Sequence, residues 1–259
     1  MVRRIRILAL ALLACALAAC ASHDDPTKDW TPERFYEEAR TAMTDGDMNT
    51  AVKYYEQLES RYPYGRYTEQ AQLEVIYAQY KNQEPALALA AADRFIRMHP
   101  THPHVDYAYY LKGLINFRGE RNFVLALFGS TDDMSDRDAK ATRESYDAFR
   151  ELTERFPSSR YAKDAAERMT YLIHNQARHE VQVAQYYFNN GAYVAAVNRC
   201  KYVLEHYPRT VSVETALGLQ AKAYHHMGLA PLVDDTVKVL RANFPESPFL
   251  EEIRALRGG

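Results

Sequence analysis

Three histidines lie close together in the segment His99-Pro-Thr-His102-Pro-His104. Imidazole is a common ligand of zinc, so this segment is the part of the sequence that comes nearest to a metal site. Its two prolines hold the segment in a turn between repeats, and His99 falls at a buried-stripe position of the repeat pattern described below. A structural turn is therefore favoured over a zinc site, and no metal is expected.

Motifs of catalysis and of phosphate binding are absent from the sequence, including GxxxxGK[ST], GxSxG, CxxC and HExxH. Acidic residues recur at helical spacing on polar faces, which gives no preferred pair of catalytic carboxylates. The formal charge of −2 is unlike that of a basic nucleic-acid-binding protein. The sequence predicts a chain that is not an enzyme and that has no cofactor and no nucleic-acid partner.

A cysteine follows an apolar run near the N-terminus. Three basic residues precede the run, namely Arg3, Arg4 and Arg6. The run 7–19 is too short to span a bilayer as a helix, and it ends Leu-Ala-Ala immediately before Cys20. This pattern looks like a bacterial lipobox, so we expect a signal peptide over 1–19 and lipidation of Cys20. The alternative is an ordinary signal peptide whose cleavage site happens to lie near a cysteine.

The residues after the predicted cleavage site indicate a short anchor. Ala21 stands where an aspartate would suggest retention in the inner membrane, so an outer-membrane location is favoured. Residues 20–31 are polar and without periodicity, which is typical of a lipidated N-terminus and tether. Cys200 is the cysteine that remains after Cys15 is removed with the signal peptide and Cys20 is lipidated. No internal disulfide can form, and Cys200 is expected to be a small buried apolar residue.

One apolar pattern is stopped by a proline five times along the chain. In the first copy Ala51, Tyr55, Leu58 and Tyr62 lie at i, i+4, i+7 and i+11, which is one stripe of a helix. The five prolines, spaced by 37, 57, 51 and 37 residues, are Pro63, Pro100, Pro157, Pro208 and Pro245. The shortest spacing is close to the tetratricopeptide period. The predicted fold is all-α, an α-solenoid of about five tetratricopeptide-like helix pairs.

The predicted solenoid covers 32–246, with repeats 1–2 in 32–102, repeat 3 in 103–159 and repeats 4–5 in 160–246. Repeat 3 carries an insertion, 119–137, with an apolar run; it either folds back onto its own repeats or contacts a partner. The stretch 160–190 lacks Gly and Pro until its end, so one helix of about 30 residues competes with two shorter helices. A tail, 247–259, is expected to form a short helix that covers the last apolar face.

Tyrosine is unusually abundant, with 20 residues against 10 phenylalanines and one tryptophan. Several lie in the first two repeats, and Tyr54, Tyr64 and Tyr67 fall outside the apolar stripe. Flat amphipathic rings of this kind are suited to holding an extended peptide in a groove. The alternative is that these tyrosines merely take the place of Phe and Leu in the packing of the repeats.

Four segments spread over the chain, together with the lipobox and the repeats, carry a family resemblance. They are YPYG at 62–65, DRFIRMHPTHPHVDYAYYLKG at 93–113, SDRD at 135–138 and YYFNNGAYVAAVNR at 186–199. The chain resembles the BamD family, the tetratricopeptide-repeat lipoproteins of the outer-membrane β-barrel assembly machinery. That resemblance implies a non-enzymatic scaffold, lipid-anchored to the outer membrane at its periplasmic face.

The resemblance also implies partners and the residues that bind them. The C-terminal repeats would dock on the POTRA region of the β-barrel insertase, through Arg199, Asn198 and Tyr193, beside the accessory lipoproteins of the complex. The N-terminal repeats would receive unfolded outer-membrane proteins, through Tyr54, Tyr64, Arg66 and Tyr67. No role is implied for the tail. The alternative function is that of an accessory repeat lipoprotein acting in peptidoglycan or cell-division organisation.

Overall fold

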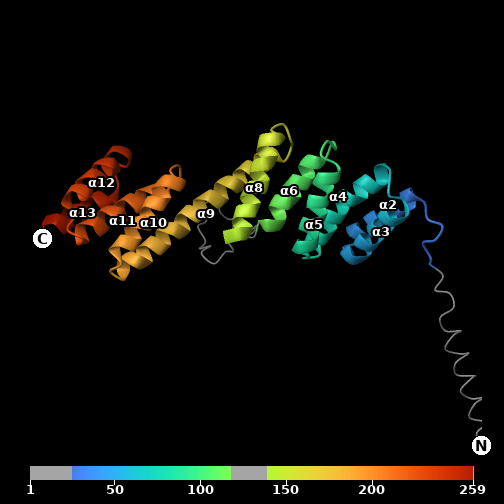
Figure 1. The fold of residues 1–259 in the computed structure, drawn as a ribbon, viewed down its shortest axis with the longest axis horizontal. Coiled ribbons are helices and arrows are strands. Elements are labelled where there is room, and N and C mark those ends of the chain that lie inside the picture. The colour runs from blue at the N-terminus through green and yellow to red at the C-terminus, as the bar shows by residue number, and fades with distance from the viewer. Residues whose placement is uncertain (1–24, 118–138, 259) are drawn as a thin grey trace, which may run out of the picture. The chain divides into compact units, whose positions relative to one another are not determined.

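The computed structural model describes residues 25–117 and 139–258 (Figure 1). These ranges contain eleven helices and no strand, which confirms the predicted all-α, tetratricopeptide-like fold. No helix in them is long and apolar enough to cross a membrane. The signal peptide 1–19, Cys20 and the insertion 119–137 lie outside the described residues. The chain divides into two compact units, the first ending at Asn82 and the second beginning at Gln83.

The first unit contains three helices, α2 (Pro32–Thr44), α3 (Met48–Arg61) and α4 (Arg66–Lys81). Helix α2 begins where Thr31 accepts a hydrogen bond from the backbone N–H of Arg34 at 3.2 Å, with Pro32 at the first helical position. Gly46 turns the chain into α3 with a φ of +85°, a conformation that glycine adopts without steric cost. The helices bury one apolar core: Phe35, Ala39, Ala51, Tyr55, Leu58 and Ala71.

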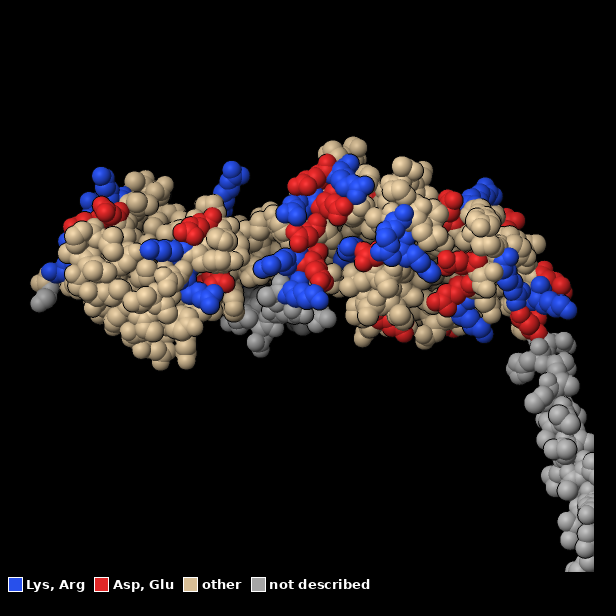
Figure 2. All heavy atoms as spheres, in the orientation of Figure 1, with Lys and Arg blue, Asp and Glu red and all other residues tan. Residues whose placement is uncertain are grey.

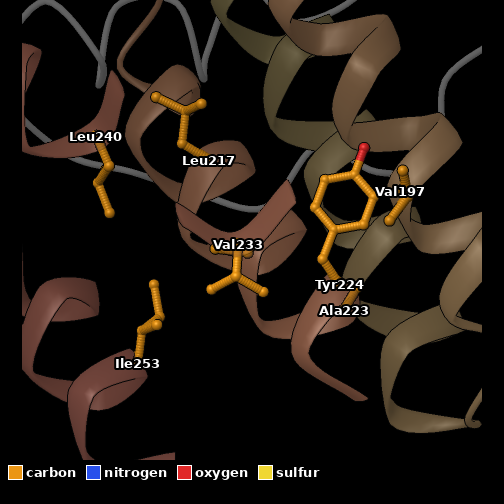
Figure 3. Close-up of a cluster of buried hydrophobic side chains, with 8 residues drawn as sticks. Val197, Leu217, Ala223, Tyr224, Val233, Leu240 and Ile253 are labelled. Atoms are coloured by element: carbon orange, nitrogen blue, oxygen red, sulfur yellow. The ribbon is translucent and has the colours of Figure 1, made fainter. Parts of the chain in front are cut away.

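The second unit contains the remaining helices, each of which packs against the next in sequence. They are α5 (Pro85–Met98), α6 (Val105–Asn116), α8 (Ala139–Arg155), α9 (Ala162–Asn189), α10 (Tyr193–His206), α11 (Ser212–His226), α12 (Ala230–Asn243) and α13 (Pro248–Gly258). Figure 3 shows the core that closes the C-terminal end, where Val197, Val233 and Ile253 come from three different helices. Helix α13 therefore covers the last repeat, as predicted for the tail.

The five aligned copies of the apolar pattern are equivalent in the structure. The position of Ala51 is buried in every copy; its other members are Ala88, Ser145, Ala196 and Val233. The position of Leu58 is also buried in every copy; its other members are Phe95, Leu152, Val203 and Leu240. The position of Tyr55 is buried in four copies, and its fifth member, Val237, is half-buried. The residues eight places after each proline, four alanines and one isoleucine, are buried too: Ala71, Ala108, Ala165, Ala216 and Ile253.

The position of Tyr62 belongs to the predicted apolar stripe, which implies burial in the core, but the structure places it differently. Its members are half-buried and end their helices, with φ between −129° and −137° in Tyr62, His99, Tyr207 and Phe244. Each still donates its N–H to the carbonyl four residues earlier. The proline that follows disfavours the helical conformation in the residue before it, so this position leaves the helix and also leaves the core.

The structure decides between one helix and two over 160–190, and it shows how the last residues of 20–31 are arranged. Helix α9 runs unbroken through 28 residues, so the interpretation of 160–190 as one helix is confirmed. The tether prediction for 20–31 is wrong over residues 25–30, which form a turn packed on the first unit and are called the strap below. Cys200 is buried, as predicted, and burial raises the pKa of its thiol to about 12.

Gly113 lies where α6 meets α8 closely. A Cβ at this position would be 2.3 Å from the ring of Phe149, which is fully buried, and Ser145 Oγ donates to the Gly113 carbonyl at 2.9 Å. The replacement Gly113→Ala is therefore expected to lower the free energy of unfolding by about 1–3 kcal/mol through overpacking. Urea denaturation followed by circular dichroism measures this, with the open Gly258→Ala as control. An unchanged midpoint would contradict the close approach.

Candidate functional sites

Arg199 lies on the first half of α10, facing α9. Its Nη1 donates to Oε2 of Glu180 at 3.0 Å, and the Arg199 side chain is 45% exposed whereas that of Glu180 is 14% exposed. Glu180 accepts from one guanidinium nitrogen and the side chain is still half exposed, so the fork keeps further donors for a ligand. A guanidinium fixed in this way can bind a carboxylate through two parallel hydrogen bonds.

A pocket of about 360 Å³ opens beside this guanidinium. Its lining consists of Tyr187, Ala195, Asn198, Arg199 and Tyr202. Asn198 is exposed, so its amide can donate to and accept from a partner's backbone. The arrangement suits an acidic side chain carried on an extended segment or strand, and we call it the Arg199 pocket.

The wall of the Arg199 pocket is braced by aromatic stacking. The ring of Tyr202 stacks on His206 at 4.0 Å and meets Tyr207 edge-on at 5.9 Å. Burial, and to a lesser extent the neighbouring Tyr202, raises the pKa of Tyr207 to about 12. The Tyr207 hydroxyl therefore stays neutral at neutral pH.

Tyr193 lies apart from the Arg199 pocket. Its ring stacks on His226 with centroids 4.8 Å apart and planes 5° apart, and Phe188 meets it edge-on at 5.5 Å. Of the three predicted partner-binding residues, the structure thus brings Arg199 and Asn198 together and places Tyr193 in a second aromatic cluster. Sequence reasoning missed Glu180 and Tyr187, which become neighbours of Arg199 through the pairing of α9 with α10. It also missed Tyr202, which lies three residues after Arg199 on α10 itself.

Tyr64, Arg66 and Tyr67 lie together where the chain passes from α3 to α4. Tyr64 is 91% exposed, between Pro63 and Gly65. The Arg66 guanidinium lies 4.7 Å from the centroid of the Tyr67 ring, and its Nη2 donates to the Tyr67 hydroxyl at 3.0 Å. These three residues, the α3–α4 tip, offer two aromatic surfaces and a cation to a ligand.

The α3–α4 tip rests on a buried aromatic layer. Tyr36 lies between Tyr67 and Tyr55, with ring centroids 5.7 Å and 5.8 Å away. Burial raises the pKa of Tyr36 to about 12, and the charge of Glu74 adds to the shift. The Tyr67 hydroxyl also donates to Oε1 of Glu33 at 3.0 Å, which ties the start of α4 to the start of α2.

Tyr54 is not free in the way that the sequence predicted. Its ring is half-buried and packs edge-on against Trp30 at 5.1 Å. Tyr67 is likewise held by Tyr36, Glu33 and Arg66, so Tyr64 alone among the predicted client-binding tyrosines projects freely. The structure groups Tyr64, Arg66 and Tyr67 and places Tyr54 under the strap.

The histidines of the segment 99–104 form a turn, as predicted. Nδ1 of His102 accepts a hydrogen bond from the backbone N–H of His104 at 3.1 Å. In the described residues no group of histidine, cysteine or acidic side chains is placed to hold a metal ion.

On the face of the second unit shown in Figure 2, acidic and basic side chains mix over α8, and a wide part of the C-terminal helices shows neither. No single-sign surface is visible there.

Paired helices whose second member is followed by a proline define the chain as a tetratricopeptide-like helical-repeat protein. The chain belongs to the YfiO family, described as outer membrane lipoprotein, whose model matches residues 28–240. This confirms the resemblance found in the sequence.

Two relatives illustrate the family. The outer membrane protein assembly factor BamD of Neisseria gonorrhoeae is 46% identical over 244 residues, which are 94% of this chain and 91% of that protein. BamD of Vibrio cholerae is 38% identical over 237 residues, 92% and 96% of the two chains. Among solved structures, MamA is slightly similar, with a TM-score of 0.34 and 14% identity over 82% of this chain and 90% of that one.

Proposed function

We propose that this chain is a non-enzymatic scaffold of outer-membrane protein assembly, anchored to the outer membrane through a lipid on Cys20 and facing the periplasm. It docks on the POTRA region of the β-barrel insertase, next to accessory lipoproteins of the same complex, and it receives unfolded outer-membrane proteins. The proposal is supported by membership of the YfiO family and by the name assembly factor that the relatives bear.

The Arg199 pocket is the observation that carries the docking part of the proposal. A half-exposed guanidinium, oriented by a nearly buried carboxylate, is prepared for an acidic group of a partner. Its orientation costs little entropy on binding because the ion pair with Glu180 already restricts the side chain. Asn198 extends the contact to the partner's backbone. Tyr193 contributes by holding the α9–α10 turn through its stack on His226.

The α3–α4 tip carries the proposed client contact. Tyr64 offers an exposed ring, and Arg66 on Tyr67 offers a cation beside a second ring. Unfolded barrel segments alternate apolar and polar side chains, and such rings bind the apolar ones while the hydroxyls and guanidinium pair with backbone carbonyls. Tyr54 supports this surface indirectly, through Trp30.

Depletion of the protein in cells tests the proposed function. Levels of many outer-membrane barrels are expected to fall together, because a shared assembly step is lost. Quantitative mass spectrometry of outer membranes measures this, with wild-type expression as the restoring control. A wall or division defect with unchanged barrel levels would contradict the proposal and favour the accessory role in peptidoglycan or division.

Tyr64→Ala is expected to weaken the binding of a barrel-derived peptide about fivefold, because an exposed ring supplies about 1 kcal/mol of contact. Fluorescence anisotropy with a labelled peptide measures the affinity. The matched control is Tyr186→Ala, which removes a ring that is 66% exposed on the second unit. Equal weakening by both variants would show that the tip is not the site.

A further inference from the structure

The strap, residues 25–30, is fixed to the first unit at its beginning by Arg61. The guanidinium of Arg61, at the end of α3, donates to the carboxylate of Asp25 and to the carbonyl of Thr27. Thr27 is 3% exposed, and its N–H and hydroxyl donate to Asp25 Oδ1 at 2.9 Å and 2.7 Å. A planar fork that binds two groups at once makes Arg61 a clamp for this segment.

The strap is fixed again at its end by Trp30. Its ring lies 5.1 Å from both Phe35 and Tyr54, and the Arg34 guanidinium lies 4.8 Å from its centroid. The Trp30 carbonyl accepts a hydrogen bond from the hydroxyl of Tyr62 at 2.8 Å. Within the strap, the N–H groups of Lys28 and Trp30 donate to backbone carbonyls at 3.0 Å and 3.1 Å. The strap is therefore a folded part of the first unit.

The strap and the α3–α4 tip occupy the same end of the first unit. Arg61, which holds the strap, is three residues before Tyr64 in the chain. Tyr62, which binds the Trp30 carbonyl, accepts a hydrogen bond from Thr68 on α4 at its own carbonyl. The bond from Tyr67 to Glu33 joins the same end of α2 and α4.

The length of the chain before the strap limits how far this end can lie from Cys20. Five residues lead from Cys20 to Asp25, and they span at most about 17 Å when fully extended. Without the docked strap the free chain would run twelve residues, from Cys20 to Pro32, and would span up to about 40 Å. Docking the strap therefore removes more than half of the reach of the tether.

We propose that the strap holds the Tyr64-bearing end of the first unit at the lipid surface, with Arg61 as its clamp. This inference rests on the proposed function, because it takes Cys20 as the lipid anchor. It assigns a place to client capture: the α3–α4 tip meets an unfolded barrel protein close to the bilayer that the barrel enters.

Quenching by lipid headgroups tests the position of this end. The lipidated full chain is placed in phosphatidylethanolamine–phosphatidylglycerol vesicles that carry a headgroup quencher, with a fluorophore on Ser60→Cys or on Asp45→Cys, both exposed sites. These sites lie at opposite ends of α3, whose 14 residues measure about 20 Å. Cys200 stays unlabelled because its thiol is buried.

The label at position 60 is expected to be quenched about twofold more than the label at position 45. A twelve-residue Gly/Ser insertion after Asp24 does not touch the described fold, and it is expected to reduce this difference to about a fifth or less, because it adds flexible reach of about 20 Å. Arg61→Ala is expected to reduce it in part, and Lys53→Ala, an exposed change on the same helix, not at all. Equal quenching at both sites, or a difference that the insertion leaves unchanged, would overturn the proposal.

Hydrogen exchange in detergent separates the strap from the anchor. The amides of Lys28 and Trp30 are expected to exchange at least about tenfold faster in Arg61→Ala than in the parent chain, because both report opening of the strap. Unchanged exchange would overturn the role of Arg61. A protected strap in a chain that does not associate with vesicles would instead show that the lipid anchor of the proposed function fails.

Discussion

Arg199→Glu is expected to lower the affinity for the POTRA region of the insertase by at least about tenfold, that is by about 1.4 kcal/mol or more. The variant removes the guanidinium that an acidic partner would bind. It also places a second carboxylate beside Glu180, whose side chain is 14% exposed, so the pocket becomes a source of repulsion. Co-purification from solubilised envelopes, followed by titration with the isolated POTRA region, measures the loss.

Two variants control for the change of charge and for the orientation of Arg199. Lys201→Glu makes the same change of charge on an exposed position of α10 that does not line the pocket, and it is expected to bind within about twofold of the parent chain. Glu180→Gln keeps the shape of the pair and removes its charge, so binding is expected to weaken less than in Arg199→Glu. Because Arg199 is 45% exposed, the affinity of the parent chain is also expected to fall with salt. Normal co-purification of Arg199→Glu would contradict the docking role.

The repeats could be predicted from the sequence because each is marked by residues with a strict backbone effect. A proline follows the second helix of each pair, and Gly46, Gly191 and Gly228 have positive φ in the turns between the two helices of a pair. Between these marks the apolar stripe fixes which face is buried. The prediction failed at Tyr62 because a residue before proline leaves the helix, and periodicity does not take account of that.

The contact between Arg199 and Glu180 could not be predicted. Glu180 and Arg199 are 19 residues apart on two helices, and their contact depends on how far α9 continues before it turns. Apolar periodicity fixes the buried faces of both helices, but it does not fix which polar residues meet at the edge of the contact.

The strap carried a signal that composition concealed. Its polar residues suggested a tether, yet Trp30 directly precedes the N-cap Thr31 and packs on Phe35, the fourth helical residue. This is the spacing of a hydrophobic staple, which fixes the path of the chain into a helix. The clamp itself had no such signal, because Arg61 binds a carbonyl and a carboxylate 34 and 36 residues earlier in the chain.

Cys20→Ser is expected to release the mature chain from the membrane, provided that it is exported behind an ordinary cleavable signal peptide. Without the thiol, no diacylglyceryl group can be attached to residue 20. Each methylene buried in the bilayer contributes about 0.8 kcal/mol, so the free energy of membrane binding falls by many kcal/mol. No described helix could replace the lipid by crossing the bilayer. Fractionation after an alkaline wash and the mass of the N-terminal peptide measure the change.

Cys15→Ser, made in the parent chain, is the matched control, because that thiol lies inside the predicted signal peptide and is removed with it. It is expected to leave acylation and fractionation unchanged. A parent chain that already fractionates as soluble and carries no added mass would show that the ordinary signal peptide is the correct interpretation.

Loss of the anchor also has a consequence for the client site. In Cys20→Ser the strap stays docked, since its contacts lie within the first unit, but the α3–α4 tip is no longer held near a bilayer. Peptide binding in solution is then expected to be preserved while barrel assembly in cells falls, which separates the chemistry of the tip from its position.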